Sequence, residues 1–217
     1  MSPYEILSVV GVFIGLISSA IIGFFTYKNA KKTTELQEEN NQRLNSEKYL
    51  DWNMVERFVD GIVQKIDYDN FEPDCIYAPG PRGAIIAELI NKRLRKQKPI
   101  FVGLSFMEKD KADSMPDYEF FTKIKTRSDI CIYIPDNMPI KKTDRILIIR
   151  DHSKTGRCFK QVKDNFVKRG YDIEKIRTAC ISYEKISNAL YEDIFCIPDY
   201  FCLEISGDIW FPWGKNK

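Results

Sequence analysis

Histidine is nearly absent from this chain of 217 residues, since His152 is the only one. The sequence also has no Cys-x-x-Cys pair, so the usual ligand sets of zinc sites are missing and no zinc site is expected. A ligand contact and a solvent-facing loop position are both open for His152. The cysteines lie in or beside apolar runs, which indicates buried free thiols in a reducing compartment. They are Cys75, Cys131, Cys158, Cys180, Cys196 and Cys202.

The chain also lacks a large net charge. Lysine and arginine total 33 against 31 acidic residues, which leaves a formal charge of +2. Because nucleic-acid-binding domains usually carry a clear basic excess, no nucleic-acid partner is predicted. The sequence contains no internal repeat and no low-complexity tract. Its hydrophobic content of 44% is enough for one sizeable core, so one binding or catalytic domain plus a smaller part is expected.

One long apolar run is present near the start of the chain. The segment from Ile6 to Tyr27 has no charged side chain and, at ~1.5 Å per residue, can cross a hydrocarbon core of ~30 Å. A cleaved signal peptide would have basic residues before the run, whereas here Glu5 precedes it and Lys28 follows it. We interpret residues 1–27 as a single transmembrane anchor, with a buried helix of a soluble protein as the alternative. The basic flank predicts an N-terminus outside and the rest in the cytoplasm, at the cytoplasmic (inner) membrane.

Small residues recur every four positions within this run, at Gly11, Gly15, Ser19 and Gly23. This spacing lines one helix face with small side chains and allows two membrane helices to pack closely. A homo-oligomer through this stripe is therefore expected. Glycine and serine are common in membrane helices, so a coincidental stripe is the alternative.

Residues 28–48 are polar, without glycine or proline, and are interpreted as a helical stalk. From residue 49 onward the pattern predicts a folded domain, 49–217, in which strands alternate with helices. Such alternation is typical of an α/β domain with a mainly parallel sheet. Helices are expected over 49–66, 82–96 and 155–170, and strands over 75–80, 99–106, 129–135, 144–151 and 173–183.

The segment Arg150 to Cys158 follows the strongest predicted strand. Ligands in parallel α/β sheets bind at the carboxyl ends of the strands, and a helix that begins there presents free N–H groups and a positive dipole. Gly156 allows close backbone approach, Ser153 and Thr155 offer hydroxyls, and Lys154 adds positive charge. A phosphate-binding loop is one interpretation, and an ordinary helix N-cap is the other.

Three segments in order resemble the type I phosphoribosyltransferases. ILIIRDHSKTGRC, from Ile146 to Cys158, resembles the signature that binds phosphoribosyl pyrophosphate (PRPP). IYAPGPRGAIIAEL, from Ile76 to Leu89, resembles the pyrophosphate loop of the same family. IPDYFCLEISGDIWFPW, from Ile197 to Trp213, resembles the C-terminal segment that covers the purine in the hypoxanthine and xanthine-guanine branch. The resemblance spans about 49–217 and implies a Rossmann-like, phosphoribosyltransferase-like fold.

The resemblance also implies roles for individual residues. Asp151 matches an acid that holds ribose hydroxyls, and Thr155 matches the loop around the 5-phosphate. The pyrophosphate loop corresponds to Pro81, Arg82 and Gly83. The full set expected to bind PRPP or phosphate is Arg150, Asp151, Ser153, Lys154, Thr155, Gly156, Arg157 and Cys158.

Two positions depart from the family pattern. Arg150 stands where the family has an acid near the metal-bound sugar, which argues against the Mg²⁺ that would otherwise accompany PRPP. Lys154 replaces the aspartate that handles a proton of the base, and a protonated lysine cannot accept one. If the protein is catalytic, Asp151, Lys154 and Arg82 are the expected catalytic residues. No protein ligands for a metal are assigned.

The aromatic C-terminus suggests a purine-stacking surface. Trp210 and Phe211 are the predicted base-binding residues, with Trp213 as a further ring; the alternative is that these rings only cap the core. Asp199 and Asp208 are candidates to contact the edges of the base.

Two functions remain open at this stage. The first is a membrane-anchored enzyme that joins a purine-type base to PRPP or runs the reverse cleavage. The second is a catalytically degenerate sensor or effector that binds PRPP or a nucleotide and signals through its anchor. By resemblance alone, membrane-tethered domains of this kind are associated with bacterial anti-phage defence.

Overall fold

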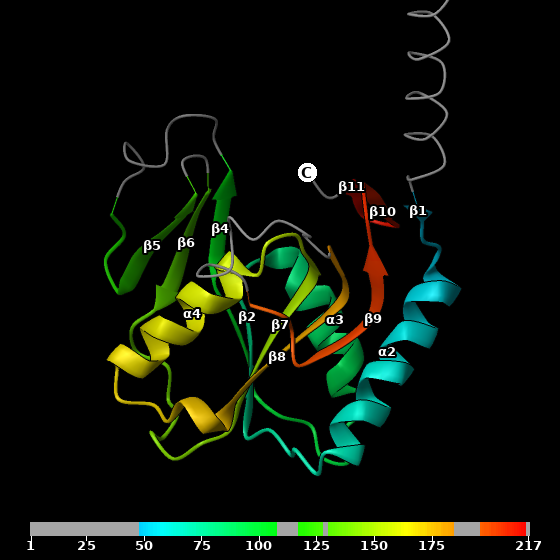
Figure 1. Ribbon diagram of the computed structural model, residues 1–217. Helices are drawn as coiled ribbons and strands as arrows, with labels where there is room; N and C mark the ends of the chain where they lie inside the picture. Colours follow the sequence, from blue (N-terminus) through cyan, green and yellow to red (C-terminus); the bar gives the residue numbers. More distant parts are fainter. Residues whose placement is uncertain (1–47, 108–116, 128–129, 185–195, 216–217) are drawn as a thin grey trace, which may run out of the picture. The chain divides into compact units, whose positions relative to one another are not determined.

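The computed structural model of the protein describes residues 48–107, 117–127, 130–184 and 196–215, which form one compact unit that begins at Lys48 (Figure 1). The predicted anchor, its stripe of small residues and the predicted stalk up to Glu47 lie outside the described residues. Within the described ranges, no helix combines the length and the apolar character that a membrane crossing requires.

A five-stranded parallel sheet forms the centre of the unit and confirms the predicted α/β architecture. Its strands are β2 (Cys75–Ala78), β3 (Ile100–Val102), β7 (Ile146–Ser153), β8 (Ile176–Glu184) and β9 (Tyr200–Ile205). They lie in the order β3-β2-β7-β8-β9, and every neighbouring pair is parallel. The chain therefore winds one way from β2 to β3 and the other way from β7 to β9, so the strand order reverses between β2 and β7.

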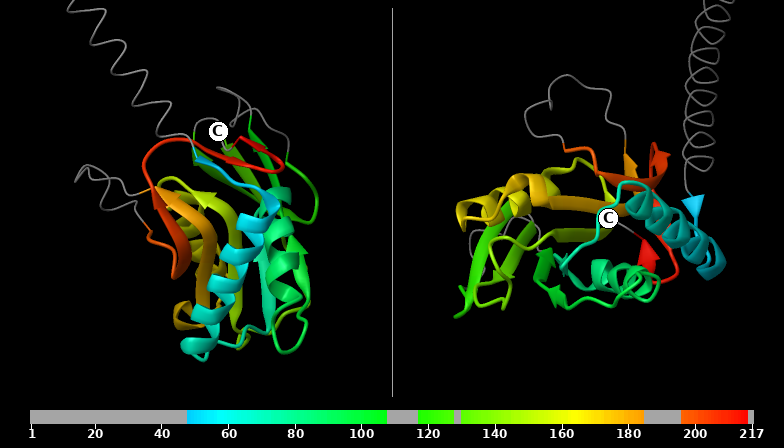
Figure 2. Two further views of the ribbon diagram at one scale, coloured as in Figure 1. Left: turned by 90° about the vertical axis from the view of Figure 1, so that its right-hand side faces the viewer. Right: turned by 90° about the horizontal axis from the view of Figure 1, so that it is seen from below.

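Helices cover both faces of this sheet. Helices α2 (Trp52–Tyr68) and α3 (Pro81–Asn91) lie side by side on one face, and α4 (Arg157–Lys168) lies on the other (Figures 1 and 2). Asp51 caps α2 by accepting a hydrogen bond from the backbone N–H of Met54 at 2.7 Å. Because both faces are covered, consecutive residues of the central strands are apolar, as in Ile146 to Ile149 of β7, rather than alternating with polar ones.

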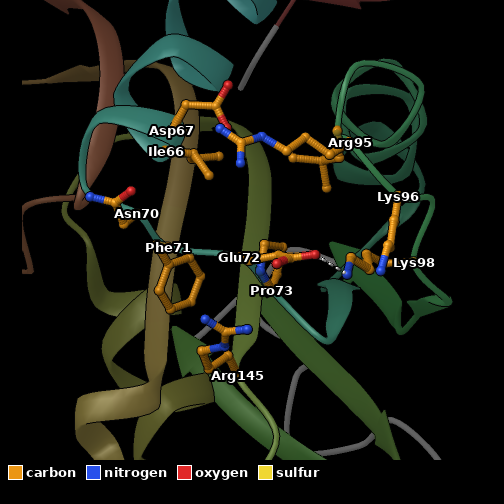
Figure 3. A pocket seen from close by; sticks show the side chains of 11 residues that line it. Ile66, Asp67, Asn70, Phe71, Glu72, Pro73, Arg95, Lys96, Lys98 and Arg145 are labelled. Atoms are coloured by element: carbon orange, nitrogen blue, oxygen red, sulfur yellow. Dashed lines mark hydrogen bonds and ion pairs between the residues drawn. The ribbon is translucent and has the colours of Figure 1, made fainter.

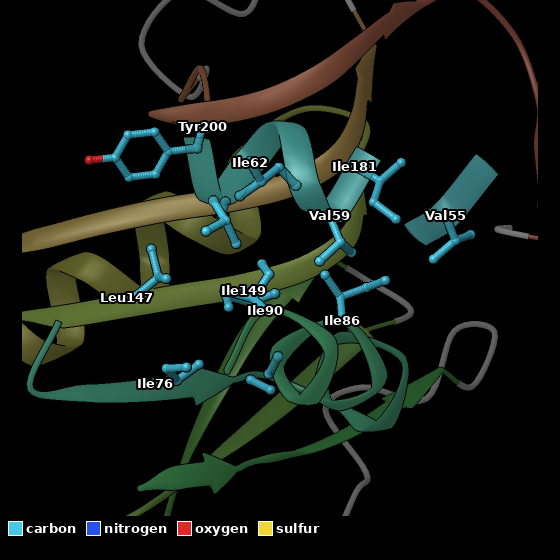
Figure 4. Close-up of a cluster of buried hydrophobic side chains, with 14 of the residues drawn as sticks. Val55, Val59, Ile62, Ile76, Ile86, Ile90, Leu147, Ile149, Ile181 and Tyr200 are labelled. Carbon is cyan, nitrogen blue, oxygen red and sulfur yellow. The ribbon is translucent and has the colours of Figure 1, made fainter. Parts of the chain in front are cut away.

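Strand β7 shows how one sequence serves two cores. Leu147 and Ile149 pack with α2 and α3 in the larger cluster, which Figure 4 shows. Ile146 and Ile148 point the other way, into the cluster that contains Phe159 of α4. All four are fully buried. Successive side chains of a strand point to opposite faces of the sheet. The polar residues at the end of β7 therefore also alternate between the two faces.

A second sheet lies beside α4 and was not predicted. It is antiparallel, with β4 (Leu104–Met107), β6 (Ile130–Pro135) and β5 (Phe121–Arg127) in the order β4-β6-β5. The strand predicted over 99–106 is in fact divided between the two sheets at Gly103. A Cβ at Gly103 would lie 2.3 Å from the hydroxyl oxygen of Tyr77, so only glycine fits there. The N–H of Gly103 donates to the carbonyl of Ala78 at 2.8 Å, and the chain leaves the parallel sheet at this point.

Other element boundaries also differ from the prediction. Helix α3 ends at Asn91 rather than residue 96, because the Asn91 side chain makes two hydrogen bonds to the backbone of Lys98. Strand β7 continues to Ser153, two residues beyond the predicted end, and α4 then begins at Arg157. A short 3-10 turn, Ile173–Lys175, precedes β8.

The two ends of the unit meet in a small third sheet. Strand β1 (Lys48–Tyr49) pairs in parallel with β10 (Ile209–Phe211), which pairs antiparallel with β11 (Gly214–Lys215). The N–H of Leu50 donates to the carbonyl of Trp210 at 2.8 Å, and the rings of Tyr49 and Trp210 stack with centroids 5.7 Å apart. The chain's entry into the unit is thus fastened to its aromatic C-terminal segment.

Candidate functional site at the strand-order reversal

The carboxyl ends of β2 and β7 lie next to each other at the point where the strand order reverses. In open α/β sheets this is where ligands bind, because the two connections leave toward opposite faces and open a crevice. Helix α3 follows β2, and α4 follows β7. The N-caps of these helices, Gly80 and Gly156, provide no side-chain cap, and neither first turn holds an acidic residue. Two positive helix ends therefore converge at one edge of the sheet.

Gly83 brings the two connections into direct contact. A Cβ at this position would lie 2.4 Å from the carbonyl oxygen of Ile149 and 3.3 Å from the Cα of Arg150. The first turn of α3 consequently packs on the backbone of β7, just before its polar end. The predicted pyrophosphate loop, Pro81 to Gly83, thus lies beside the predicted PRPP segment, with Arg82 in the first turn of α3.

Asp151 is a buried carboxylate at this edge, with only 2% of its surface exposed. Its Oδ1 accepts a hydrogen bond from the N–H of His152 at 2.9 Å, and its Oδ2 accepts one from Nε1 of Trp213 at 3.3 Å. Sequence reasoning named Trp213 only as an additional ring. The structure identifies it as the aromatic side chain that contacts the predicted ribose-binding acid.

Arg150 precedes Asp151 but makes a different set of contacts. Its side chain hydrogen-bonds Cys158 in the first turn of α4. The interaction with Cys158, followed by that with Asp151, raises the pKa of Arg150 despite its burial. Cys158, one of the residues expected to bind PRPP or phosphate, here serves as a partner of Arg150.

His152 is buried inside β7 rather than exposed in a loop. Its Nδ1 lies 2.9 Å from Oγ of Ser182 on the neighbouring strand. Burial lowers the pKa of His152 to about 4; Arg150 and Lys154 also lower it, while Asp151 opposes them. The imidazole is neutral at pH 7, so it adds no positive charge to the site.

The connection between β7 and α4 has less open space than the sequence suggested. Gly156 is in the left-handed region, with φ 68°, and a Cβ there would lie 2.1 Å from the carbonyl oxygen of Cys196. The close approach that Gly156 permits is therefore an approach to protein backbone. The left-handed backbone and this close packing both favour glycine here.

The other residues of this connection have modest interactions of their own. Lys154 forms an exposed ion pair with Glu184, with an N–O distance of 3.7 Å. Oγ1 of Thr155 accepts a long hydrogen bond, 3.4 Å, from the N–H of Arg157. Ser153 is buried at the end of β7.

The two residues predicted to bind the base each contact another aromatic ring. Phe211 is a core residue, only 4% exposed, and its ring stacks on that of Trp213 at 5.0 Å. The ring of Trp210 is stacked on Tyr49.

Asp199, a candidate for contacting the edge of a base, lies at the opposite end of the sheet. Its Oδ2 accepts hydrogen bonds of 2.7 Å from both the N–H and the hydroxyl of Thr178, near the start of β8. It also forms an ion pair with Lys163 at 3.1 Å. Asp199 therefore fastens β9 to β8 at the amino ends of these strands.

The residues at this edge do not form a ready-made Mg²⁺ site. Both oxygens of Asp151 are engaged in hydrogen bonds, and the cationic Arg150 is its neighbour in β7. Across the described part of the chain, no group of three or more His, Cys, Asp or Glu side chains is arranged to hold a metal ion. A Mg²⁺ ion at this site would depend mainly on oxygen atoms of the ligand that carried it.

Comparison with known proteins agrees with this geometry at the level of the fold. No family model matches the sequence, and no curated protein matches it either. Among solved structures, a purine phosphoribosyltransferase from Pyrococcus horikoshii Ot3 is similar with a TM-score of 0.55 and 22% identity, over 79% of this chain and 96% of that one. A xanthine-guanine-hypoxanthine phosphoribosyltransferase from Helicobacter pylori gives a TM-score of 0.52 and 15% identity, over 77% and 94% of the two chains.

A third similar structure is a hypothetical protein from Neisseria gonorrhoeae with bound ppGpp. Its TM-score is 0.57 and its identity 14%, over 77% of this chain and 89% of that one. At these identities the similarity concerns the fold. The described unit of this protein therefore has the parallel-sheet α/β fold of the phosphoribosyltransferases.

Proposed function

We propose that this protein binds PRPP or a purine nucleotide in the crevice between β2 and β7. The observation that carries the proposal is the convergence of two helix N-termini without side-chain caps beside the buried carboxylate of Asp151. The α3 end, with Arg82, is suited to a diphosphate, and the α4 end to a 5-phosphate. Asp151 is suited to accept hydrogen bonds from ribose hydroxyls. The names of the similar proteins, purine phosphoribosyltransferases and a ppGpp-bound protein, support a purine-type ligand.

The first form of the proposal is a phosphoribosyltransferase. In this reaction the bond between C1 of the ribose and the diphosphate breaks, a bond forms between C1 and a nitrogen of the base, and the proton lost by the base passes to water. The positive end of α3 and Arg82 would stabilise the negative charge on the departing diphosphate.

The second form is a sensor or effector that binds the same ligand without turnover. Its support is the pair of contacts that leads away from the site: Trp213 bonds Asp151, and the neighbouring β10 is paired with β1. A ligand that engages Asp151 acts on a segment that is fastened to the chain entering the unit. Lys154, bound to Glu184 at the position of the family's proton acceptor, also favours this form.

The proposal extends to the cellular setting. We propose that residues 6–27 anchor the chain in the inner membrane, with the N-terminus outside and the folded unit in the cytoplasm. Recovery of the full chain in alkali-washed membranes, and its release when residues 6–27 are deleted, would support the anchor. A role in anti-phage defence rests on resemblance alone and predicts that deleting the gene raises phage plating efficiency.

One titration separates the two forms. The full-length chain is titrated in a calorimeter with PRPP, with and without Mg²⁺, and then with GMP and IMP. Mixtures of PRPP with guanine or hypoxanthine are then assayed for released pyrophosphate. Binding with release establishes an enzyme, and binding without release establishes a sensor or effector. Arg82→Gln should lower the affinity about tenfold, equivalent to about 1.4 kcal/mol. Lys92→Gln, at the other end of α3, is the matched control, and an equal effect of both variants would contradict the assigned site.

A further inference from the structure

A second pocket lies at the opposite end of the sheet from the candidate site. Figure 3 shows its lining, which comes from the end of α2 and the segment after it, the loop that follows α3, and Arg145 just before β7. Its cavity of about 160 Å³ is sized for a small molecule rather than a macromolecule. Because it opens at the amino ends of the strands, it is separate from the crevice between β2 and β7.

Four basic side chains line this pocket against two acidic ones, Asp67 and Glu72. Lys98 is paired with Glu72 at 3.0 Å, and Arg145 with Asp74 at 3.5 Å. Arg95 and Lys96 also line it, and among the described residues neither forms an ion pair within 4.0 Å, although Lys96 is close enough to Glu72 to help lower the pKa of that carboxyl group. Two cations are thus left to attract an anion at the mouth of the cavity.

The loop that carries these cations is held in place. Asn91 is 7% exposed, and its side chain donates to the carbonyl of Lys98 at 3.0 Å and accepts from the N–H of Lys98 at 2.8 Å. These bonds close the loop between α3 and β3 on itself, so Arg95 and Lys96 extend from a defined backbone. Less conformational entropy is lost when a held loop binds a ligand.

The rest of the lining is mixed, with apolar side chains beside the polar Asp67, Asn70 and Glu72. Phe71 follows Asn70, whose left-handed backbone (φ 51°) ends the helical path of α2. The Phe71 ring packs against Tyr200 at 6.4 Å, and the guanidinium of Arg177 lies over it at 5.8 Å. Together with Ile66 and Leu94, this ring lines the cavity next to the cations.

We propose that this pocket is a binding site for a small phosphate monoester with an aromatic group. The phosphate would be held by Arg95 and Lys96, and the aromatic group would pack against Phe71 and Leu94. A dianionic phosphate matches two unpaired cations, and the apolar wall gives the rest of the molecule a surface to cover. The site is separate from the proposed PRPP or nucleotide site, so either can fail without the other.

Phenyl phosphate is the probe that tests this site. The full-length chain is titrated in a calorimeter with phenyl phosphate, inorganic phosphate and phenol. We expect phenyl phosphate to bind more tightly than either of the others, and Arg95→Ala with Lys96→Ala to weaken it at least tenfold. The control Lys92→Ala with Lys168→Ala removes the same charge outside the pocket and should change the affinity less than twofold. Equal losses in the two double variants would overturn the proposal.

Two further variants fix the location and the orientation of the probe. Arg82→Ala alters the candidate site at the other edge of the sheet and should leave the affinity for phenyl phosphate unchanged. If Arg82→Ala weakens binding and the Arg95→Ala, Lys96→Ala double variant does not, the probe binds at the candidate site and the proposed pocket is refuted. Phe71→Leu keeps an apolar side chain but removes the ring. It should weaken phenyl phosphate about threefold and leave inorganic phosphate unaffected, and an unchanged affinity for phenyl phosphate would contradict the assigned aromatic contact.

Discussion

Nε1 of Trp213 donates a hydrogen bond to Oδ2 of Asp151 across 3.3 Å and so joins the C-terminal segment to the polar end of β7. Oδ1 of the same carboxylate accepts from the backbone of His152. A ribose hydroxyl that binds Asp151 must therefore share or replace an existing partner. The protein itself occupies the acceptor that the proposed ligand requires.

Trp213→Phe should consequently tighten the binding of GMP or IMP. Phenylalanine preserves an aromatic ring beside Phe211 but cannot donate, so the competition for Oδ2 is removed. One hydrogen bond is worth about 0.5–1.5 kcal/mol, which predicts a two- to tenfold gain in affinity by calorimetry. Trp52→Phe is the control, because Trp52 packs on Trp213 with centroids 5.5 Å apart. Weaker binding in Trp213→Phe would mean that the indole supports the ligand rather than competing with it.

Two glycines with left-handed backbones allow the cost of backbone strain to be measured apart from the cost of a steric clash. Gly170 (φ 88°) has no atom within 4 Å of an added Cβ, whereas a Cβ on Gly156 would overlap the backbone of Cys196. Gly170→Ala should lower the free energy of unfolding by about 1 kcal/mol through backbone strain alone. Gly156→Ala should cost about 2 kcal/mol more, because the backbone of Cys196 must move. Equal losses of unfolding free energy in urea titrations of the two variants would show that the backbone of Cys196 moves aside at no measurable cost.

The buried His152 predicts a pH dependence of stability. Its folded-state pKa of about 4 lies below the ordinary value of 6.5, so between these values the unfolded chain binds more protons than the folded chain. Stability should therefore rise with pH across this window, and the contribution of His152 is lost as pH falls toward 4. The full effect is about 3 kcal/mol. His152→Gln should reduce the difference between the unfolding free energies measured at pH 4.5 and pH 7. An unchanged difference would contradict the assigned burial of His152.

Asp199 offers a test of the two ends of the sheet. Asp199→Ala leaves the fully buried N–H and hydroxyl of Thr178 without their carboxylate, which should destabilise the fold by about 2–4 kcal/mol. Ligand affinity of the folded protein should not change. The control Asp164→Ala removes an exposed carboxylate paired with Lys160 and should cost less than about 0.5 kcal/mol. Loss of nucleotide affinity in Asp199→Ala would restore its predicted contact with a base.

Hydrogen exchange tests whether the site communicates with the entry to the unit. If a ligand displaces Trp213 from Asp151, β10 should loosen from β1, and the amide of Leu50 should exchange faster because its acceptor is the carbonyl of Trp210. We expect a severalfold increase on adding GMP, and none for the amides of α2 such as Val59. The increase should disappear in Trp213→Phe. Unchanged exchange at Leu50 in the ligand-bound wild type would argue against the sensor form.

The local sequence pattern was sufficient to predict those elements whose structure depends on neighbouring residues. The apolar run of β7, its position at the centre of the sheet and the start of α4 near Gly156 follow from side-chain periodicity and helix-start chemistry. The reversal of strand order then brings the residues of both predicted loops to one edge. Gly83 reads in the sequence as a turn residue, yet its role is a contact with Ile149 far along the chain.

What the sequence did not reveal are contacts between distant segments. Residues 48 and 49 carry no strand signal and become β1 only because β10 lies beside them. The division of residues 99–106 between two sheets depends on Tyr77 and Tyr133 on other strands. Local periodicity likewise cannot indicate that Cys196 packs on Gly156, or that Trp213 rather than Trp210 reaches Asp151.

The contact of Gly83 with Ile149 also fixes a length. Because the main chains of α3 and β7 touch there, the start of α3 cannot slide along β7 without opening the sheet. The spacing between them is set by backbone, not by adjustable side chains. A ligand held in the proposed site would therefore meet a spacing between α3 and β7 that side-chain rotation alone cannot change.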